Sequence, residues 1–190
     1  KWNGASWSAL GTGFDGVPTY INALACDSSG NLYAGGEFDN AGGVTVNNIA
    51  KWDGSSWSAL LDGSDYSISA LVCDSSGNLY THFWSPPSGT LIVKFDGTSW
   101  SSLGPAICTK VHTLAFDSSG ALYSGGYLLD YPIGSDEIFK WNGTSWNRMI
   151  NYLNGTVLTI ACDSSGNIYF GGYGGAKPGT EIVKYTPLKK

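Results

Sequence analysis

The sequence predicts an all-β protein, a four-bladed β-propeller made of four-stranded antiparallel blades. Two short motifs alternate along the 190 residues, and each occurs four times. The aspartates that mark the first motif, Asp27, Asp74, Asp117 and Asp163, are spaced 47, 43 and 46 residues apart, the period of a propeller blade. No stretch shows the apolar period of a helix, and the 27 glycines predict many tight turns between short strands.

The first motif predicts two strands joined by a hairpin turn. It reads NALACDSSGNLYAGG at 22–36 and recurs at 69–83, 112–126 and 158–172. We expect strands at 23–27 and 32–35 in its first copy. The aspartate of DSSGN accepts hydrogen bonds from the following backbone N–H groups, and its glycine supplies the positive φ that the turn requires.

The second motif predicts the other two strands of each blade. It reads KWDGSSWSAL at 51–60 and recurs at 1–10, 94–103 and 140–149. A third strand, such as 49–52, leads into the Asp-Gly or Asn-Gly turn, and the SWSAL segment forms the fourth strand. Asp-Gly and Asn-Gly before a β-rich run are strong hairpin signals.

The strand count predicts how the ring closes. We expect one domain over 1–190, with blades at about 21–60, 68–103, 111–149, and 157–185 plus 6–10. The third strand type at 181–185 has no SWSAL segment after it, so the segment 6–10 is expected to complete the last blade. Closure removes the free sheet edges of an open array. A larger ring made by two copies is the alternative.

The stretch ALACDSSGNLYAGG…IAKWDGSSWSAL resembles the propeller repeats of secreted bacterial repeat proteins. Its layout is similar to that of NHL and kelch-type blades. The resemblance covers essentially the whole chain and implies a propeller fold, a bacterial source and a secreted or cell-surface location. It implies no single activity, because propellers of this kind carry unrelated functions.

Composition argues against several functional classes. The net charge of −5 and the scattered Lys and Arg residues argue against nucleic-acid binding. No apolar run is long enough to cross a membrane, so no membrane insertion is expected. With two histidines, one arginine and no metal-binding or catalytic motif, the sequence predicts no catalytic residue, no metal, no cofactor and no enzymatic activity.

The four cysteines are expected to be free thiols. Cys26, Cys73 and Cys162 share one repeat position, which Phe116 fills in the third repeat. A position that accepts Cys or Phe is an apolar packing site, so these three thiols are predicted to be buried. Cys108 lies outside the repeat.

The candidate site lies in the loops that do not repeat. The hairpin turns are nearly identical in all blades, whereas the loops expected at the other end, among them 11–20, 37–48, 61–67, 81–91, 127–137 and 173–181, differ. Function concentrates in loops on a rigid scaffold. Aromatic rings stack on sugar C–H groups and polar side chains bind hydroxyls. The predicted ligand-binding residues are Phe38, Asp39, Asn40, Trp84, Asp130, Tyr131 and Tyr173. The alternative for each aromatic is packing inside the ring.

The sequence thus predicts a non-catalytic binding module whose partner is a glycan or a protein surface. The alternative is a structural or self-assembling unit of an extracellular or surface-attached array. The low charge and near-identical blades fit either interpretation, and a homo-oligomer is compatible with both.

Overall fold

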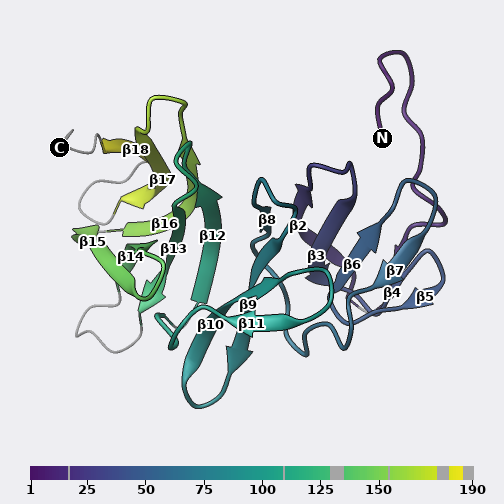
Figure 1. The fold of residues 1–190 in the computed structure, drawn as a ribbon, viewed down its shortest axis with the longest axis horizontal. Helices are drawn as coiled ribbons and strands as arrows, with labels where there is room; N and C mark the ends of the chain where they lie inside the picture. Colours follow the sequence, from purple (N-terminus) through teal and green to yellow (C-terminus); the bar gives the residue numbers. More distant parts are fainter. Residues whose placement is uncertain (17, 109, 129–134, 154, 175–179, 186–190) are drawn as a thin grey trace. The chain divides into compact units, whose positions relative to one another are not determined.

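The computed structural model describes residues 1–16, 18–108, 110–128, 135–153, 155–174 and 180–185, and shows an all-β protein with antiparallel sheets (Figure 1). The chain divides into two compact units, Lys1–Leu79 and Tyr80–Lys190. The expected all-β class is confirmed, and the expected single domain stays a prediction. No helix in the described part of the chain is long and apolar enough to cross a membrane.

The first unit contains one complete blade-type sheet. Its strand order is β2-β3-β6-β7, formed by β2 (Tyr20–Cys26), β3 (Leu32–Glu37), β6 (Ile49–Trp52) and β7 (Trp57–Ala59). A small sheet of β1 (Phe14–Asp15), β4 (Asn40–Ala41) and β5 (Val44–Thr45) is built from the loops that leave this meander. The core of the unit joins both sheets, because Phe38 and Ala41 pack with Ala50 and Trp57.

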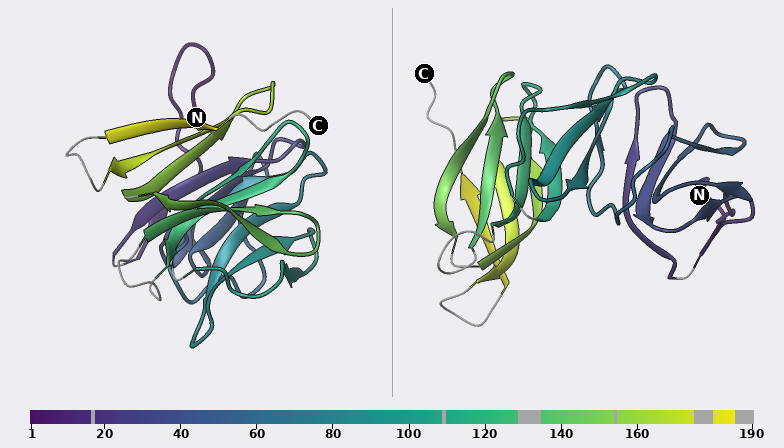
Figure 2. Two further views of the ribbon diagram at one scale, coloured as in Figure 1. Left: turned by 90° about the vertical axis from the view of Figure 1, so that its left-hand side faces the viewer. Right: turned by 90° about the horizontal axis from the view of Figure 1, so that it is seen from below.

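Three further sheets follow the same meander. The order β8-β9-β10-β11 comprises Val72–Cys73, Leu79–Ser85, Gly89–Phe95 and Trp100–Ser102, and the division between the units falls at the start of β9. The order β12-β13-β14-β15 comprises Lys110–Phe116, Leu122–Leu128, Ser135–Trp141 and Trp146–Leu153, which are green in Figure 2. The order β16-β17-β18 comprises Gly155–Cys162, Ile168–Gly174 and Thr180–Tyr185. Four-stranded antiparallel sheets are therefore confirmed, while four blades in a closed ring stay a prediction.

The predicted DSSGN turn is confirmed. Asp27 Oδ1 accepts hydrogen bonds from the backbone N–H groups of Ser29 and Asn31, both at 2.9 Å. Asp27 Oδ2 accepts further bonds from the Asn31 amide at 2.7 Å and from the Tyr33 hydroxyl at 3.2 Å. Gly30 has a φ of 85°. The equivalent aspartates Asp74, Asp117 and Asp163 each accept the same pair of backbone bonds.

The tryptophans of the second motif pack in pairs and anchor the preceding repeat. The rings of Trp52 and Trp57 are 5.4 Å apart, and Trp57 Nε1 donates to the carbonyl oxygen of Leu10 at 3.0 Å. Trp146 Nε1 makes the same bond to Leu103, at 2.7 Å. Trp7, the first member of the series, is 79% exposed. This motif therefore acts as scaffold at Trp57 and Trp146, whereas the Nε1 of the equivalent Trp100 is buried without a hydrogen-bond partner.

The cysteines differ from the prediction in one respect. All four are free thiols, as expected. Cys108 is buried and Cys73 and Cys162 are partly buried, but Cys26 is exposed. The expected burial of the three repeat cysteines is therefore wrong, most clearly for Cys26. The cause is that Cys26 ends β2, a strand with an uncovered face.

Candidate functional site

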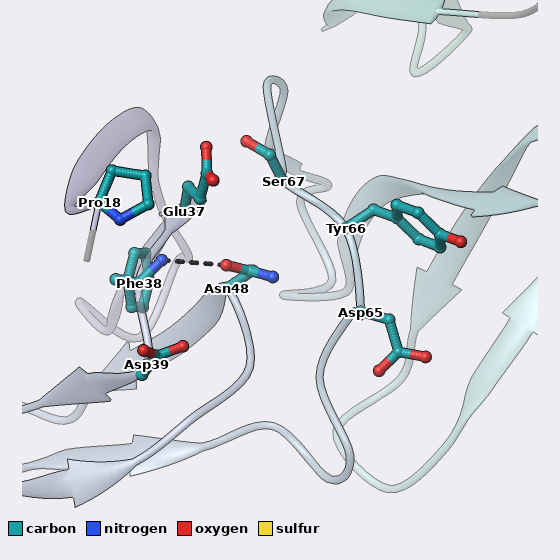
Figure 3. Close-up of a pocket in the computed structure, with 8 residues that line it drawn as sticks. All are labelled: Pro18, Glu37, Phe38, Asp39, Asn48, Asp65, Tyr66 and Ser67. Carbon is teal, nitrogen blue, oxygen red and sulfur yellow. Dashed lines mark hydrogen bonds between the residues drawn. The ribbon is translucent and has the colours of Figure 1, made fainter. Parts of the chain in front are cut away.

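A cavity of about 320 Å³ lies in the first unit, among loops that do not repeat (Figure 3). Three segments line it: Pro18 comes from the loop before β2, Glu37 to Asn48 from the β3–β6 connection, and Asp65 to Ser67 from the loop after β7. The lining residues are Pro18, Glu37, Phe38, Asp39, Asn48, Asp65, Tyr66 and Ser67. The cavity is thus lined by carboxylate, amide and hydroxyl groups together with Pro18, Phe38 and Tyr66.

Asn48 joins the two longer segments. Its backbone has a φ of 60°, a left-handed conformation that asparagine tolerates better than most residues. Its Oδ1 accepts the Phe38 N–H at 2.9 Å, and its Nδ2 donates to the Ser64 carbonyl at 2.8 Å. Its backbone also bonds to Phe38 and Gly36, at 3.1 and 2.9 Å. Because the side-chain amide is engaged at both ends, Asn48 is a positioning residue.

The loop Leu61–Ser67 is fixed against the β3–β6 connection by further bonds. Asn47 Nδ2 donates to the Asp62 carbonyl at 2.8 Å, and the Ser64 N–H donates to the Asn47 carbonyl at 2.9 Å. Gly63 has a φ of 67°, and a Cβ atom at this position would lie 2.4 Å from the Asn47 oxygen. The close approach therefore requires glycine. These hydrogen bonds therefore fix this wall of the cavity in the absence of a ligand.

Three carboxylates border the cavity. Glu37 is half-buried at the end of β3, whereas Asp39 and Asp65 are exposed. Asp39 is held by its backbone, whose N–H donates to the Asp15 carbonyl at 3.2 Å. Figure 3 shows the Glu37 carboxylate and the Ser67 hydroxyl on the same side of the cavity. Within the described residues, no ion pair joins any of the three carboxylates to a cation. The cavity therefore has a negative potential that disfavours anionic ligands.

Three of the predicted site residues lie together in the first unit. Asp39 and Phe38 line the cavity, but the Phe38 ring is only 1% exposed and packs 4.8 Å from Phe14. Asn40 does not line the cavity, because its amide donates to Asp15 Oδ1 at 2.6 Å in the small sheet. Of these three, Asp39 alone presents its side chain to a ligand in the cavity.

The other predicted site residues belong to the second unit. Trp84 is half-buried in β9, and Tyr173 is 63% exposed in β17. Asp130 and Tyr131 lie outside the described residues. A role for these residues stays a prediction.

Several cavity residues were missed by sequence reasoning, notably Glu37 and Asp65. The position of each residue in the sequence could have indicated that it lies near the site. Glu37 directly follows the Gly-Gly pair that ends the repeated strand, and Asp65 stands beside Tyr66 in a loop that varies between repeats.

Comparison with known proteins identifies the fold. No protein-family model and no curated protein sequence matches this chain. Similar solved structures include a gluconolactonase from Xanthomonas campestris, at 14% identity and a TM-score of 0.59, covering 88% of this chain and 62% of that one. Regucalcin from Agrobacterium tumefaciens, named as a calcium-binding protein, is 14% identical with a TM-score of 0.54, covering 79% and 52%. The nidogen/laminin complex is 18% identical with a TM-score of 0.55, covering 79% and 54%.

These neighbours confirm the resemblance to β-propeller repeats and correct the functional prediction. The expectation of a non-catalytic binding module without enzymatic activity is wrong, because neighbours of this fold are gluconolactonases and regucalcin. The error has a physical origin: a propeller assembles its site from loops of different repeats, so no local catalytic motif marks it. The kelch-like layout, secretion and carbohydrate binding gain no support. This chain spans between 52% and 62% of the length of these structures.

The described residues do not fit a metal centre of the usual kind. Among them, no group of three or more His, Cys, Asp or Glu side chains is placed to hold a metal ion. The one amide in the cavity, that of Asn48, is already bonded at its oxygen and its nitrogen. Calcium prefers six to eight oxygen ligands, several of them carboxylates. No catalytic step is therefore assigned to a metal here.

Proposed function

We propose that this protein is a hydrolase that opens a small, neutral, polyhydroxylated cyclic ester, such as a sugar lactone, in the cavity of the first unit. The observation that carries the proposal is that Glu37, Asp39 and Asp65 all line one cavity, without a neutralising cation in the described residues. The gluconolactonase among the solved propellers suggests the substrate class.

The chemistry needs one general base. In the proposed step Glu37 removes a proton from water while the water oxygen attacks the lactone carbonyl carbon. The ring C–O bond then breaks, and the proton passes from Glu37 to the departing alkoxide, which gives the open hydroxy acid. We assign this role to Glu37 because it ends a strand of the scaffold and is half-buried, whereas Asp39 and Asp65 are exposed.

The remaining groups suit a sugar-like substrate. Asp39, Asp65 and the Ser67 hydroxyl bond to substrate hydroxyls, and Pro18 contacts C–H faces. The product of lactone opening is a carboxylate at neutral pH. The three carboxylates repel this anion, so the charge of the cavity favours the neutral substrate and the release of product.

The test is lactone hydrolysis followed in a pH-stat, with the spontaneous rate subtracted. We expect turnover of D-gluconolactone or a related neutral aldonolactone by the full chain. Glu37→Gln is expected to lower kcat/KM by a factor of about 10² to 10³, typical for the loss of a general base. Asp53→Asn is the matched control: it makes the same charge change in an exposed hairpin turn, where another repeat carries Asn142. A wild-type rate equal to the spontaneous rate over the whole panel, or full activity in Glu37→Gln, refutes the proposal.

We also propose the number of blades and the way in which the ring closes. Four repeats form four blades, and the segment 6–10 acts as the fourth strand beside β18, which the sheet β16-β17-β18 lacks among the described residues. The repeat spacing supports this arrangement. Secretion from a bacterium, or display on its surface, is supported by the resemblance of the repeats alone.

A further inference from the structure

A β-bulge in β2 sets the direction of the Asn22 side chain. The register of the β2–β3 pair shifts between Ile21 and Ala23, so Asn22 is the extra residue. Bulges re-aim one side chain out of the regular alternation, and they are frequent next to functional sites. The same register shift occurs in β12 and β16, where the extra residues are His112 and Leu158. Among these three bulges, an amide is presented only by the one in β2.

The Asn22 amide holds the hydroxyl of Ser67, a residue that lines the cavity. Asn22 Nδ2 donates to Ser67 Oγ and to the Ile68 carbonyl oxygen, both at 3.2 Å. The Ile68 N–H donates in turn to the carbonyl oxygen of Gly36, at 2.9 Å. Gly36 directly precedes Glu37, so these bonds fix the Ser67 loop against the end of β3. All of these residues belong to the first unit.

The bond from Asn22 decides how Ser67 can act in the cavity. A serine hydroxyl has one proton to donate and two lone pairs that accept. Because the Asn22 amide is a donor, it occupies one lone pair of Ser67 Oγ and leaves the proton for another acceptor. Figure 3 shows the Ser67 hydroxyl on the same side of the cavity as the Glu37 carboxylate. Ser67 therefore presents a hydrogen-bond donor on the side where Glu37 would activate water.

The proposed reaction needs such a donor. Attack of water on a lactone carbonyl places a negative charge on the carbonyl oxygen, and the bordering carboxylates destabilise that charge. Three lining side chains can donate without carrying a charge, those of Asn48, Tyr66 and Ser67. The Asn48 amide already donates to the Ser64 carbonyl, and Figure 3 shows the Tyr66 ring turned away from Glu37. Ser67 is thus the lining side chain that is placed to offset the charge.

We propose that Ser67 donates a hydrogen bond to the lactone carbonyl oxygen, and that Asn22 is the positioning residue for this donor. As water adds to the carbonyl carbon, the carbonyl oxygen becomes an anion and the bond from the Ser67 O–H strengthens, while the proton stays on Ser67. When the ring C–O bond breaks, the carbonyl reforms, and Glu37 passes the proton taken from water to the departing alkoxide. The second lone pair of Ser67 Oγ remains for a substrate hydroxyl. This inference rests on the proposed function and names the group that stabilises its transition state.

The first test measures kcat and KM for D-gluconolactone in the pH-stat, with the full chain. Ser67→Ala is expected to lower kcat by a factor of about 10² and to change KM by less than about twofold, because the bond strengthens only as charge develops. Ser67→Thr keeps the hydroxyl and is expected to keep most of the rate. Ser58→Ala is the matched control, because the Ser58 hydroxyl bonds to the Lys51 carbonyl in the β6–β7 hairpin and does not line the cavity.

The second test concerns Asn22 and uses a double variant. Asn22→Leu removes the amide without adding charge, and Leu158 already occupies the same bulge position in the fourth repeat. It is expected to lower kcat by a factor of about 10, near the upper end of the net value of one hydrogen bond. In the Ser67→Ala background the same substitution should leave kcat unchanged, since no hydroxyl is left to orient. A purely structural role of Asn22 would lower kcat equally in both backgrounds.

The results distinguish a failure of this role from a failure of the proposed hydrolysis. If the wild type opens the lactone while Ser67→Ala keeps its kcat, or loses only in KM, Ser67 is not the donor and hydrolysis by Glu37 stands. If the wild type shows no turnover, both proposals fail. Acid quenching during turnover, followed by the mass of the intact chain, gives a further check. A gain of one substrate mass that Ser67→Ala abolishes would make Ser67 a nucleophile and overturn the inference. Equal losses from Asn22→Leu in both backgrounds overturn the positioning role.

Discussion

The bond between Asp117 and Tyr123 is expected to hold the third repeat together, and its contribution can be measured. Asp117 Oδ2 accepts the Tyr123 hydroxyl at 2.9 Å, while Oδ1 accepts the N–H groups of Ser119 and Ala121. The Tyr123 side chain is 0% exposed and belongs to the core of the second unit. Burial, with the neighbouring carboxylate, raises the pKa of Tyr123, so its hydroxyl remains a neutral donor.

The magnitude follows from what each substitution leaves behind. Asp117→Ala leaves a buried hydroxyl without its acceptor, which costs roughly 1–3 kcal/mol, and the lost turn bonds add about 1 kcal/mol. We therefore expect a loss of about 3 kcal/mol in the free energy of unfolding. Tyr123→Phe should cost only about 1 kcal/mol, because the carboxylate keeps its backbone donors. In the double variant the orphaned hydroxyl is absent, so the two effects should overlap by about 2 kcal/mol.

The assay is urea denaturation followed by tryptophan fluorescence for the wild type, both single variants and the double variant. Asp53→Ala combined with Tyr123→Phe is the control cycle, because Asp53 lies in the other unit and the two effects should be additive. A coupling energy below about 0.5 kcal/mol for Asp117 and Tyr123 would refute the reasoning, because that is the scatter expected of independent sites.

Three other features of the chain give predictions. Burial, with His112 nearby, lowers the pKa of His82 to about 4, so between pH 6.5 and 4 the unfolded state binds a proton that the native state refuses. Stability should therefore fall as the pH drops through this window, by up to about 3 kcal/mol, and an equally steep fall in His82→Gln would contradict this cause. Gly63→Ala should lower the free energy of unfolding by about 2 kcal/mol in thermal denaturation, because alanine at a φ of 67° is strained and its Cβ would lie 2.4 Å from a carbonyl oxygen; an unchanged Tm argues against the constraint. Iodoacetamide should label Cys26 in the folded monomer well before Cys108, as peptide mass mapping would show, and equal rates would mean that the described burial is wrong.

The repeats made most of the fold predictable. The DSSGN turn follows from local chemistry, because the Asp27 carboxylate bonds to donors only two to four residues away. The Asp-Gly turn before Trp57 is equally local, with Asp53 accepting from residues 55 and 56. Turns of this kind are determined by motifs of a few residues. Four copies of each motif make the assignment more certain than one copy would.

The cavity was not predictable in the same way. The hydrogen bond from Asn48 to Ser64 joins residues 16 positions apart, and it depends on a left-handed φ that many residues at such a position would avoid. The same limit explains the missed carboxylates. Glu37 ends β3 and Asp65 lies in the loop after β7, and their position around one cavity depends on how the connecting loops fold back. The sequence indicated which loops vary, and it predicted Asp39 as a site residue. It could not indicate which side chains from different loops line the same cavity.

Leu24 shows a further limit, which concerns assembly. At this repeat position the sequence specifies a large apolar residue in every copy, and three of the four side chains are buried. The repeat therefore encodes an apolar first-strand face in every copy, and this face packs on a glycine of the preceding repeat at Gly35 and at Gly125. It does not encode what covers this face in β2. Keeping Leu24 and Ile21 in water forgoes about 25 cal/mol for each Å² of apolar surface that could be covered.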